Sequence, residues 1–403
     1  MVQLVLFRAV QGLGAGGVQP MANTIIGDIY TPPERARIQG LLSGVFAVSA
    51  LAGPSLGAFL VEHVSWQSVF WVNLPVGAAA AAMIVGLLHE RVERRPHKVD
   101  CAGAVLLALS AGALTLLLVQ GAGLSRAMAA TAGTVSLAAG AMLAWHLRRT
   151  PEPLLPVELW RNRVIVIGST GSGVIGAVMM GIAAFLPAYM QAVMGCSVAA
   201  AGCVIGMMTV VWALSSAAAG QILVRTTYRL TATIGAILLV LGCLTLAATT
   251  PARGIAWAAA GVFLAGAGMG FCNTTFMVSV QAAVPWRQRG AATSSAMFLR
   301  FMGQALGAAG FGAVLNISLM RHGPGAANAL GQLLDPQAGS LLAPETAAAM
   351  AGMVADGMRG GFLSAGFLAV IALVLARLLP IGLSPWGVPP KPLSDKPGNQ
   401  KNA

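Results

Sequence analysis

The sequence predicts an all-α protein that crosses a membrane many times. Three observations support this prediction: 57% of the 403 residues are hydrophobic, only 9% are charged, and the apolar residues form long runs. A soluble domain carries about 25% charged residues, so this chain has too few charges to cover a water-facing surface. The mean hydropathy of +0.79 agrees with a membrane protein, and so do the 50 glycines, because glycine is common in membrane helices.

Eleven apolar stretches are long enough to cross a bilayer, which takes about 20 residues in a helix. Runs of this length predict helices because a helix satisfies its own backbone hydrogen bonds, whereas barrel strands would be shorter and would alternate. In chain order, the predicted spans are residues 3–26, 38–61, 68–89, 101–121, 127–147, 164–187, 200–224, 230–249, 254–280, 291–317 and 360–382.

The positive charges orient these spans. With the N-terminus outside, eighteen of the 24 Lys and Arg residues fall on the cytoplasmic side, and the C-terminus is cytoplasmic. This bias is the one that membrane proteins show. The net charge of +12 is therefore explained by orientation in a bilayer, and we expect no nucleic acid as a partner. The outer residues are Arg126, Arg253, Arg321 and Arg359, and Arg8 and Arg300 lie inside spans.

The sequence shows no signature of an enzyme or of a metal protein. The five cysteines and five histidines have no metal-ligand spacing, and no His, Ser or acidic residues cluster near an interface. We therefore expect no catalytic residue, no metal and no cofactor.

The first span contains an arginine followed by a glutamine and glycines: Arg8, Gln11 and Gly12. An arginine inside a membrane helix is costly and suggests a function. The alternative is that Arg8 extends to the outer interface, about two turns away. The glycines allow neighbouring helices to approach closely.

The second span contains Gly53, Pro54 and Gly57. A proline inside a helix removes a hydrogen bond and kinks the helix. The two glycines, four residues apart, make one flat face, a pattern that many membrane helices use for packing alone. The third span begins after Trp66 with Trp71, which suits a membrane interface, and Asn73 lies just inside the helix.

These three motifs, in this order, resemble the 14-helix drug:proton antiporter branch of the major facilitator superfamily. The resemblance implies a major facilitator fold in which about 11 of an expected 14 helices are present and the first three are missing. It places Asp28, Arg35 and Arg37 in a cytoplasmic loop. The sequence departs from the pattern at Ser49, Ala58 and Gln67.

The resemblance also implies a division of the chain. Residues 1–89 would form an incomplete N-terminal lobe, 90–159 two linker helices with their loops, 160–382 a C-terminal lobe of six helices, and 383–403 a cytoplasmic tail. We expect residues 319–358 to be an outer connection, either a short amphipathic excursion or a disordered cap.

The polar residues inside the later spans are candidates for lining a cavity. Asn273 and Thr274 share one span, and Arg300 and Gln304 lie one turn apart in the next. Arg300 lies about three turns into its span, where facing lipid would be costly. The alternative for Arg300 is pairing with backbone carbonyls in helix packing.

The function that the resemblance implies is secondary transport: proton-coupled export of drugs or other small amphipathic compounds. Its partners would be a small-molecule substrate, protons and the lipid bilayer of a bacterial inner membrane, with the protein a monomer or bound to a periplasmic adaptor. All twelve acidic residues lie in loops or at span ends. The proton-carrying acid would therefore come from an upstream segment, or the chain as written is inactive. The alternatives are a degenerate or scaffolding membrane protein, and an exporter of a specific metabolite such as a siderophore or a sugar.

Overall fold

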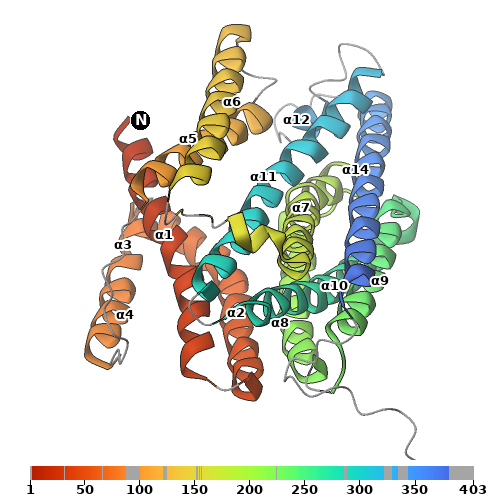
Figure 1. Ribbon diagram of the computed structural model, residues 1–403. Helices are drawn as coiled ribbons and strands as arrows, with labels where there is room; N and C mark the ends of the chain where they lie inside the picture. The colour runs from red at the N-terminus through yellow and green to blue at the C-terminus, as the bar shows by residue number, and fades with distance from the viewer. Residues whose placement is uncertain are drawn as a thin grey trace, which may run out of the picture.

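The structure, a computed structural model, is helical throughout the part of the chain that it describes (Figure 1). No strand occurs in that part, which confirms the all-α prediction. The described residues are 2–30, 32–65, 67–87, 100–120, 125–150, 153, 155, 157–223, 225–285, 288–321, 329–334 and 344–380.

The first helices are α1 (Val2–Ile29), α2 (Pro32–His63), α3 (Ser68–Trp71) and α4 (Asn73–Leu87). The predicted span 68–89 is therefore broken near its start. Pro75 has no N–H to donate to the carbonyl of Trp71, which weakens the helix at this point. The side-chain amide of Asn73 donates instead to the carbonyl of Val69, at 3.1 Å, and bridges the break.

Two further helices, α5 (Cys101–Gln120) and α6 (Arg126–Arg149), pack against each other as a hairpin. Ser110 donates a hydrogen bond to the carbonyl of Ser136 at 3.0 Å, and Ser136 donates one to the carbonyl of Ser110 at 3.1 Å. This reciprocal pair fixes the register of the two helices, because each hydroxyl finds its acceptor on the partner helix in an apolar setting.

The remaining helices form the best-packed part of the molecule. Its main hydrophobic core runs from Val164 to Leu379 and includes the fully buried Ile182, Leu239 and Phe276. Asn162 joins two helices of this part. Its side chain caps the helix that begins at Arg163, and it also donates to the carbonyl of Ala283, just after the helix that ends at Ala282, at 3.2 Å. The elements are η1 (Val157–Arg161), α7 (Arg163–Ala192), α8 (Val198–Leu223), α9 (Tyr228–Ala247), η2 (Pro251–Arg253), α10 (Gly254–Ala282), α11 (Arg289–Arg321), α12 (Ala329–Leu334) and α14 (Pro344–Leu378).

The outer connection expected at 319–358 is mostly helical where it is described, so that expectation was wrong for its second half. The last helix begins at Pro344, well before the predicted start at residue 360. Pro344 suits the first position of a helix, and Glu345 suits the first turn. Val354 and Met358 are buried in the main core, and this burial stabilises the added turns.

Nine helices in the described part are long and apolar enough to cross a membrane, and they coincide with the nine predicted spans from residue 68 onward. The first two predicted spans, 3–26 and 38–61, are the helices α1 and α2, of 28 and 32 residues.

The early helices contact the later ones at specific places. Helix α2 packs against α8, whereas α1 and α5 pack against α11. Figure 1 shows α11 passing between the α5–α6 hairpin and α7. By contrast, α4 buries none of its residues. The face that α8 and α11 present toward α1 and α2 is therefore the junction between the N-terminal and C-terminal helices.

Candidate functional site

Arg300 is a charged residue well inside α11, at the twelfth of its 33 positions. Its Nε atom is buried and has no hydrogen-bond partner among the described residues, although the residue as a whole keeps part of its surface accessible. The guanidinium carbon lies 5.1 Å from the centre of the Trp212 ring, on α8. A cation above an aromatic face is attracted by the negative charge of that face. The pair therefore links α11 to α8.

Close contact between α7 and α11 determines where Arg300 lies. A Cβ atom added to Gly173 would lie 3.1 Å from the carbonyl oxygen of Leu299, and one added to Gly176 would overlap the backbone carbonyl of Arg300. A side chain at Gly303 would overlap the backbone of Gly173. Small residues let the two helix backbones approach, as in other membrane-helix pairs. The backbone of Arg300 and the start of its side chain therefore lie against Gly176.

Trp212 is held by a similar contact between α8 and α10. A Cβ atom on Gly270 would lie 2.6 Å from the carbonyl oxygen of Trp212. One turn along each helix, the hydroxyls of Ser216 and Thr274 share a buried hydrogen bond of 2.5 Å. This side-chain bond between helices satisfies two hydroxyls that water does not reach. Thr274, a predicted cavity residue, is only 4% exposed and serves this contact.

The side chains of Asn273, on α10, and Gln304, on α11, make no hydrogen bond with another described residue. The Oδ1 atom of Asn273 is buried and has no partner. The helical repeat places Asn273 between Gly270, which faces α8, and Phe276, which packs against Gly171 of α7. Gln304 is half-buried on α11, one turn after Arg300. Asn273 and Gln304 lie on helices that each pack against α7.

The predicted motif residues of the N-terminal helices lie on α1, α2 and α4, apart from the contact between Arg300 and Trp212. Gln11 and Gly12 are exposed on α1. Gly53 and Gly57 lie on α2, and no atom of the described residues outside their own helix turn lies within 4 Å of a Cβ added to either of them. Asn73 is exposed and bonds to its own chain, as described above. The remaining predicted side chains lie outside the described part, although their backbones are helical: Arg8, Asp28, Arg35, Arg37 and Pro54. The expectation that Asp28, Arg35 and Arg37 belong to a loop was therefore wrong, because α1 continues to Ile29 and α2 begins at Pro32.

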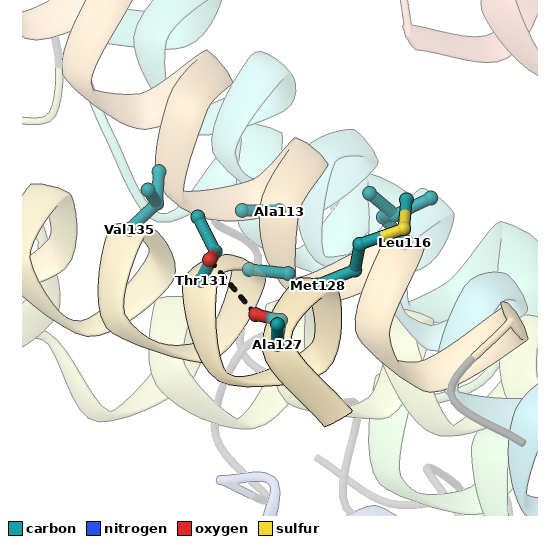
Figure 2. A pocket seen from close by; sticks show the side chains of 7 residues that line it. Ala113, Leu116, Ala127, Met128, Thr131 and Val135 are labelled. Carbon is teal, nitrogen blue, oxygen red and sulfur yellow. Dashed lines mark hydrogen bonds between the residues drawn. The ribbon is translucent and has the colours of Figure 1, made fainter. Parts of the chain in front are cut away.

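Two largely apolar hollows are lined by residues other than Arg300. Figure 2 shows the first, of about 400 Å³, between α5 and α6. Its polar lining residue is Thr131, whose hydroxyl donates to the carbonyl of Ala127 at 2.8 Å and is thereby used within its own helix. The second, of about 460 Å³, is a groove along α7, α11 and α14. The polar residues that line the groove are Thr170 and Ser364, and the hydroxyl of Ser364 donates to the carbonyl of Gly361 at 2.6 Å, within its own helix. Ligand sites combine apolar walls with converging polar groups, and neither hollow brings a charged side chain to its wall.

Within the described residues, no group of three or more His, Cys, Asp or Glu side chains is placed to hold a metal ion. Sequence reasoning identified Arg300, Asn273 and Gln304 but missed Trp212. A tryptophan near the middle of the predicted span 200–224, away from either interface, was the available signal.

The comparisons with known proteins agree on one family. Residues 1–308 match the model of the Major Facilitator Superfamily. The chain is 31% identical over 317 residues to Multidrug resistance protein 3 of Bacillus subtilis, and 28% identical over 320 residues to Multidrug transporter protein MdtP of the same organism. Each alignment covers 78% of this chain but only 62% and 59% of the relatives, so the chain spans about 60% of their length.

The fold is also similar to a solved structure. A bacterial homologue of the human lysosomal transporter Spinster, in an inward-facing and occupied conformation, superposes with a TM-score of 0.52. The match covers 94% of this chain and 76% of the homologue at 20% sequence identity. At that identity the likeness concerns the fold alone.

Proposed function

Because the chain belongs to the Major Facilitator Superfamily, we propose that it works in a secondary transporter that exports drugs or other small amphipathic compounds. The names of its relatives support export of this kind, since both refer to multidrug resistance or transport. The chain spans only part of their length, so the activity of a whole exporter is here a proposal.

The observation that carries the proposal is the position of Arg300 and Trp212. They lie on α11 and α8, the two later helices that also contact α1 and α2. Transporters with repeated helix groups bind their substrate between the two groups, near the middle of the membrane. Arg300 is the twelfth of the 33 residues of α11, so it lies well inside the span.

The finer features of the proposal come from the motif series. The motifs at Arg8, Gly53 and Asn73 support the 14-helix drug:proton antiporter branch and exchange of substrate for protons. A proton entering across 100 mV releases about 2.3 kcal/mol, enough to drive export. We also propose the division at residues 1–89, 90–159, 160–382 and 383–403, a bacterial inner-membrane location with a cytoplasmic C-terminus, and a monomer with or without a periplasmic adaptor.

Inverted membrane vesicles test the proposal. The protein would be expressed from a reading frame that encodes at least residues 1–403, in cells whose own drug exporters have been deleted. The dyes ethidium, rhodamine 123 and 5-carboxyfluorescein would then be offered outside the vesicles. We expect at least one dye to accumulate when an inward-acid proton gradient is imposed, and to leave when a protonophore is added. The absence of gradient-dependent uptake of all three, relative to vesicles without the chain, would refute the proposal.

A further inference from the structure

We propose that Arg300 and Trp212 form a binding site for the anionic group of an amphipathic substrate, such as a carboxylate or sulfonate next to an aromatic ring. This inference rests on the proposed transport function and narrows its substrate class. Within the small amphipathic compounds expected as substrates, it favours organic anions over lipophilic cations.

The first argument is the charge balance around Arg300. The acidic side chains that the structure describes are Glu34, Asp100, Glu158, Glu345 and Asp356, and all except Asp100 are exposed. Asp100 pairs with His146 at 2.7 Å, at the end of the α5–α6 hairpin. In the described part of the chain, no carboxylate pairs with Arg300. A buried charge without a partner costs several kcal/mol, so the site favours an anion from outside the described residues.

The second argument is the shape of the donor group. A guanidinium presents several N–H groups in a planar fork that matches the two oxygens of a carboxylate or sulfonate. Arg300 makes no recorded hydrogen bond with a described residue, and its Nε is buried without a partner. Trp212 holds one face of the group but accepts no strong hydrogen bond. The donors of Arg300 therefore remain for a ligand.

The third argument is the apolar wall beside the charge. Trp212 is half-buried and packs against the main core, so part of its ring is accessible. An aromatic ring of a ligand can stack there while its acidic group reaches Arg300. A lipophilic cation would gain the same aromatic contact, but its charge would be repelled by the guanidinium of Arg300, which lies 5.1 Å from the centre of the same ring. The site consequently discriminates by the sign of the charge.

The experiment compares two dyes that share a xanthene ring system and differ in charge. The protein, incorporated in nanodiscs of phosphatidylcholine, is titrated against 5-carboxyfluorescein and against rhodamine 123, with fluorescence anisotropy as the readout. The variants are Arg300→Gln, Arg300→Lys and Trp212→Phe. The matched control is Arg321→Gln, the same change at an exposed position on the same helix.

We expect Arg300→Gln to weaken carboxyfluorescein binding by about 10- to 100-fold, the range for losing a charged hydrogen bond. Arg300→Lys should lose less because it keeps the charge, and it serves as the test if Arg300→Gln does not fold. Rhodamine 123 should bind weakly to the wild type and at least as well to Arg300→Gln. The Arg321→Gln control should bind both dyes as the wild type does.

Two outcomes would overturn the inference. One is carboxyfluorescein binding that is unchanged in Arg300→Gln and Arg300→Lys, or rhodamine binding that falls equally. The other is displacement of carboxyfluorescein when one quarter of the nanodisc lipid is phosphatidylglycerol, since the site would then hold a lipid headgroup. The assay contains no proton gradient. Specific binding without vesicle uptake would therefore refute the proposed function alone, and uptake without Arg300-dependent binding would refute this inference alone.

Discussion

The Nε2 atom of His146 lies 2.7 Å from the Oδ1 atom of Asp100, which joins the last turn of α6 to the start of α5. The same carboxylate oxygen accepts a hydrogen bond from the backbone N–H of Gly103 at 2.8 Å. Asp100 therefore caps α5 and closes the hairpin at once, and its side chain is only 4% exposed. A negative charge at this end also interacts favourably with the helix dipole.

The double role of Asp100 predicts a graded response to substitution. Asp100→Ala removes the cap and the pairing, which should cost about 1 kcal/mol or more at the start of α5. Asp100→Asn keeps an oxygen for the N–H of Gly103 and should cost less. Hydrogen exchange at the first amides of α5 measures the effect, with Asp356→Ala as the control at an exposed acid. Equal exchange in the wild type and Asp100→Ala would show that the cap is not needed.

The contact between Gly303 and Gly173 predicts that α11 tolerates no added side chain at that position. A methyl group at Gly303 would overlap the backbone of Gly173, so Gly303→Ala should destabilise the protein by about 1–3 kcal/mol. Gly310, two turns further along the same helix, has no such neighbour within 4 Å. Gly310→Ala should therefore be neutral or stabilising, because alanine favours helix. Thermal midpoints in detergent compare the two, and similar midpoints would contradict the close contact.

Two buried tyrosines provide a matched test of one hydrogen bond. The hydroxyl of Tyr189 on α7 donates to the carbonyl of Thr249 at 2.9 Å, whereas the buried hydroxyl of Tyr228 has no partner in the described residues. Tyr189→Phe should cost about 1 kcal/mol because it strands a buried acceptor. Tyr228→Phe should be neutral or stabilising because it removes an unsatisfied group. A larger loss for Tyr228→Phe, in the same thermal assay, would overturn this assignment.

Hydropathy and span length predicted most of the fold, because the bilayer requires long apolar helices. The start of α14 was missed because residues 344–358, rich in small residues, are less apolar than the span that follows. Their helix is stabilised by burial of Val354 and Met358 against other helices. Because this contact is between helices, the local hydropathy pattern of residues 344–358 does not predict it.

The candidate site was predictable only in part. The cost of placing a charge in a span identified Arg300. The partnership with Trp212 depends on how closely α7, α8, α10 and α11 approach one another, and the decisive contacts at Gly176 and Gly270 involve backbones from different helices. The glycine pairs also show that sequence spacing alone does not predict a close helix contact. Gly303 and Gly307 pack tightly on α7, whereas Gly53 and Gly57 of α2, with equal spacing, have no such neighbour.

The open surroundings of Gly53 predict a separation between stability and transport. A methyl group there meets no other helix among the described residues, so Gly53→Ala should leave the thermal midpoint unchanged or slightly raised. If the glycine face of α2 packs against another helix in a different conformation of the transport cycle, the same variant should slow dye uptake in inverted vesicles. Gly86→Ala on α4, which also has open space around it and lies outside the motifs, is the matched control. A fall in thermal midpoint that parallels the fall in uptake would instead place Gly53 in a close contact of the resting structure.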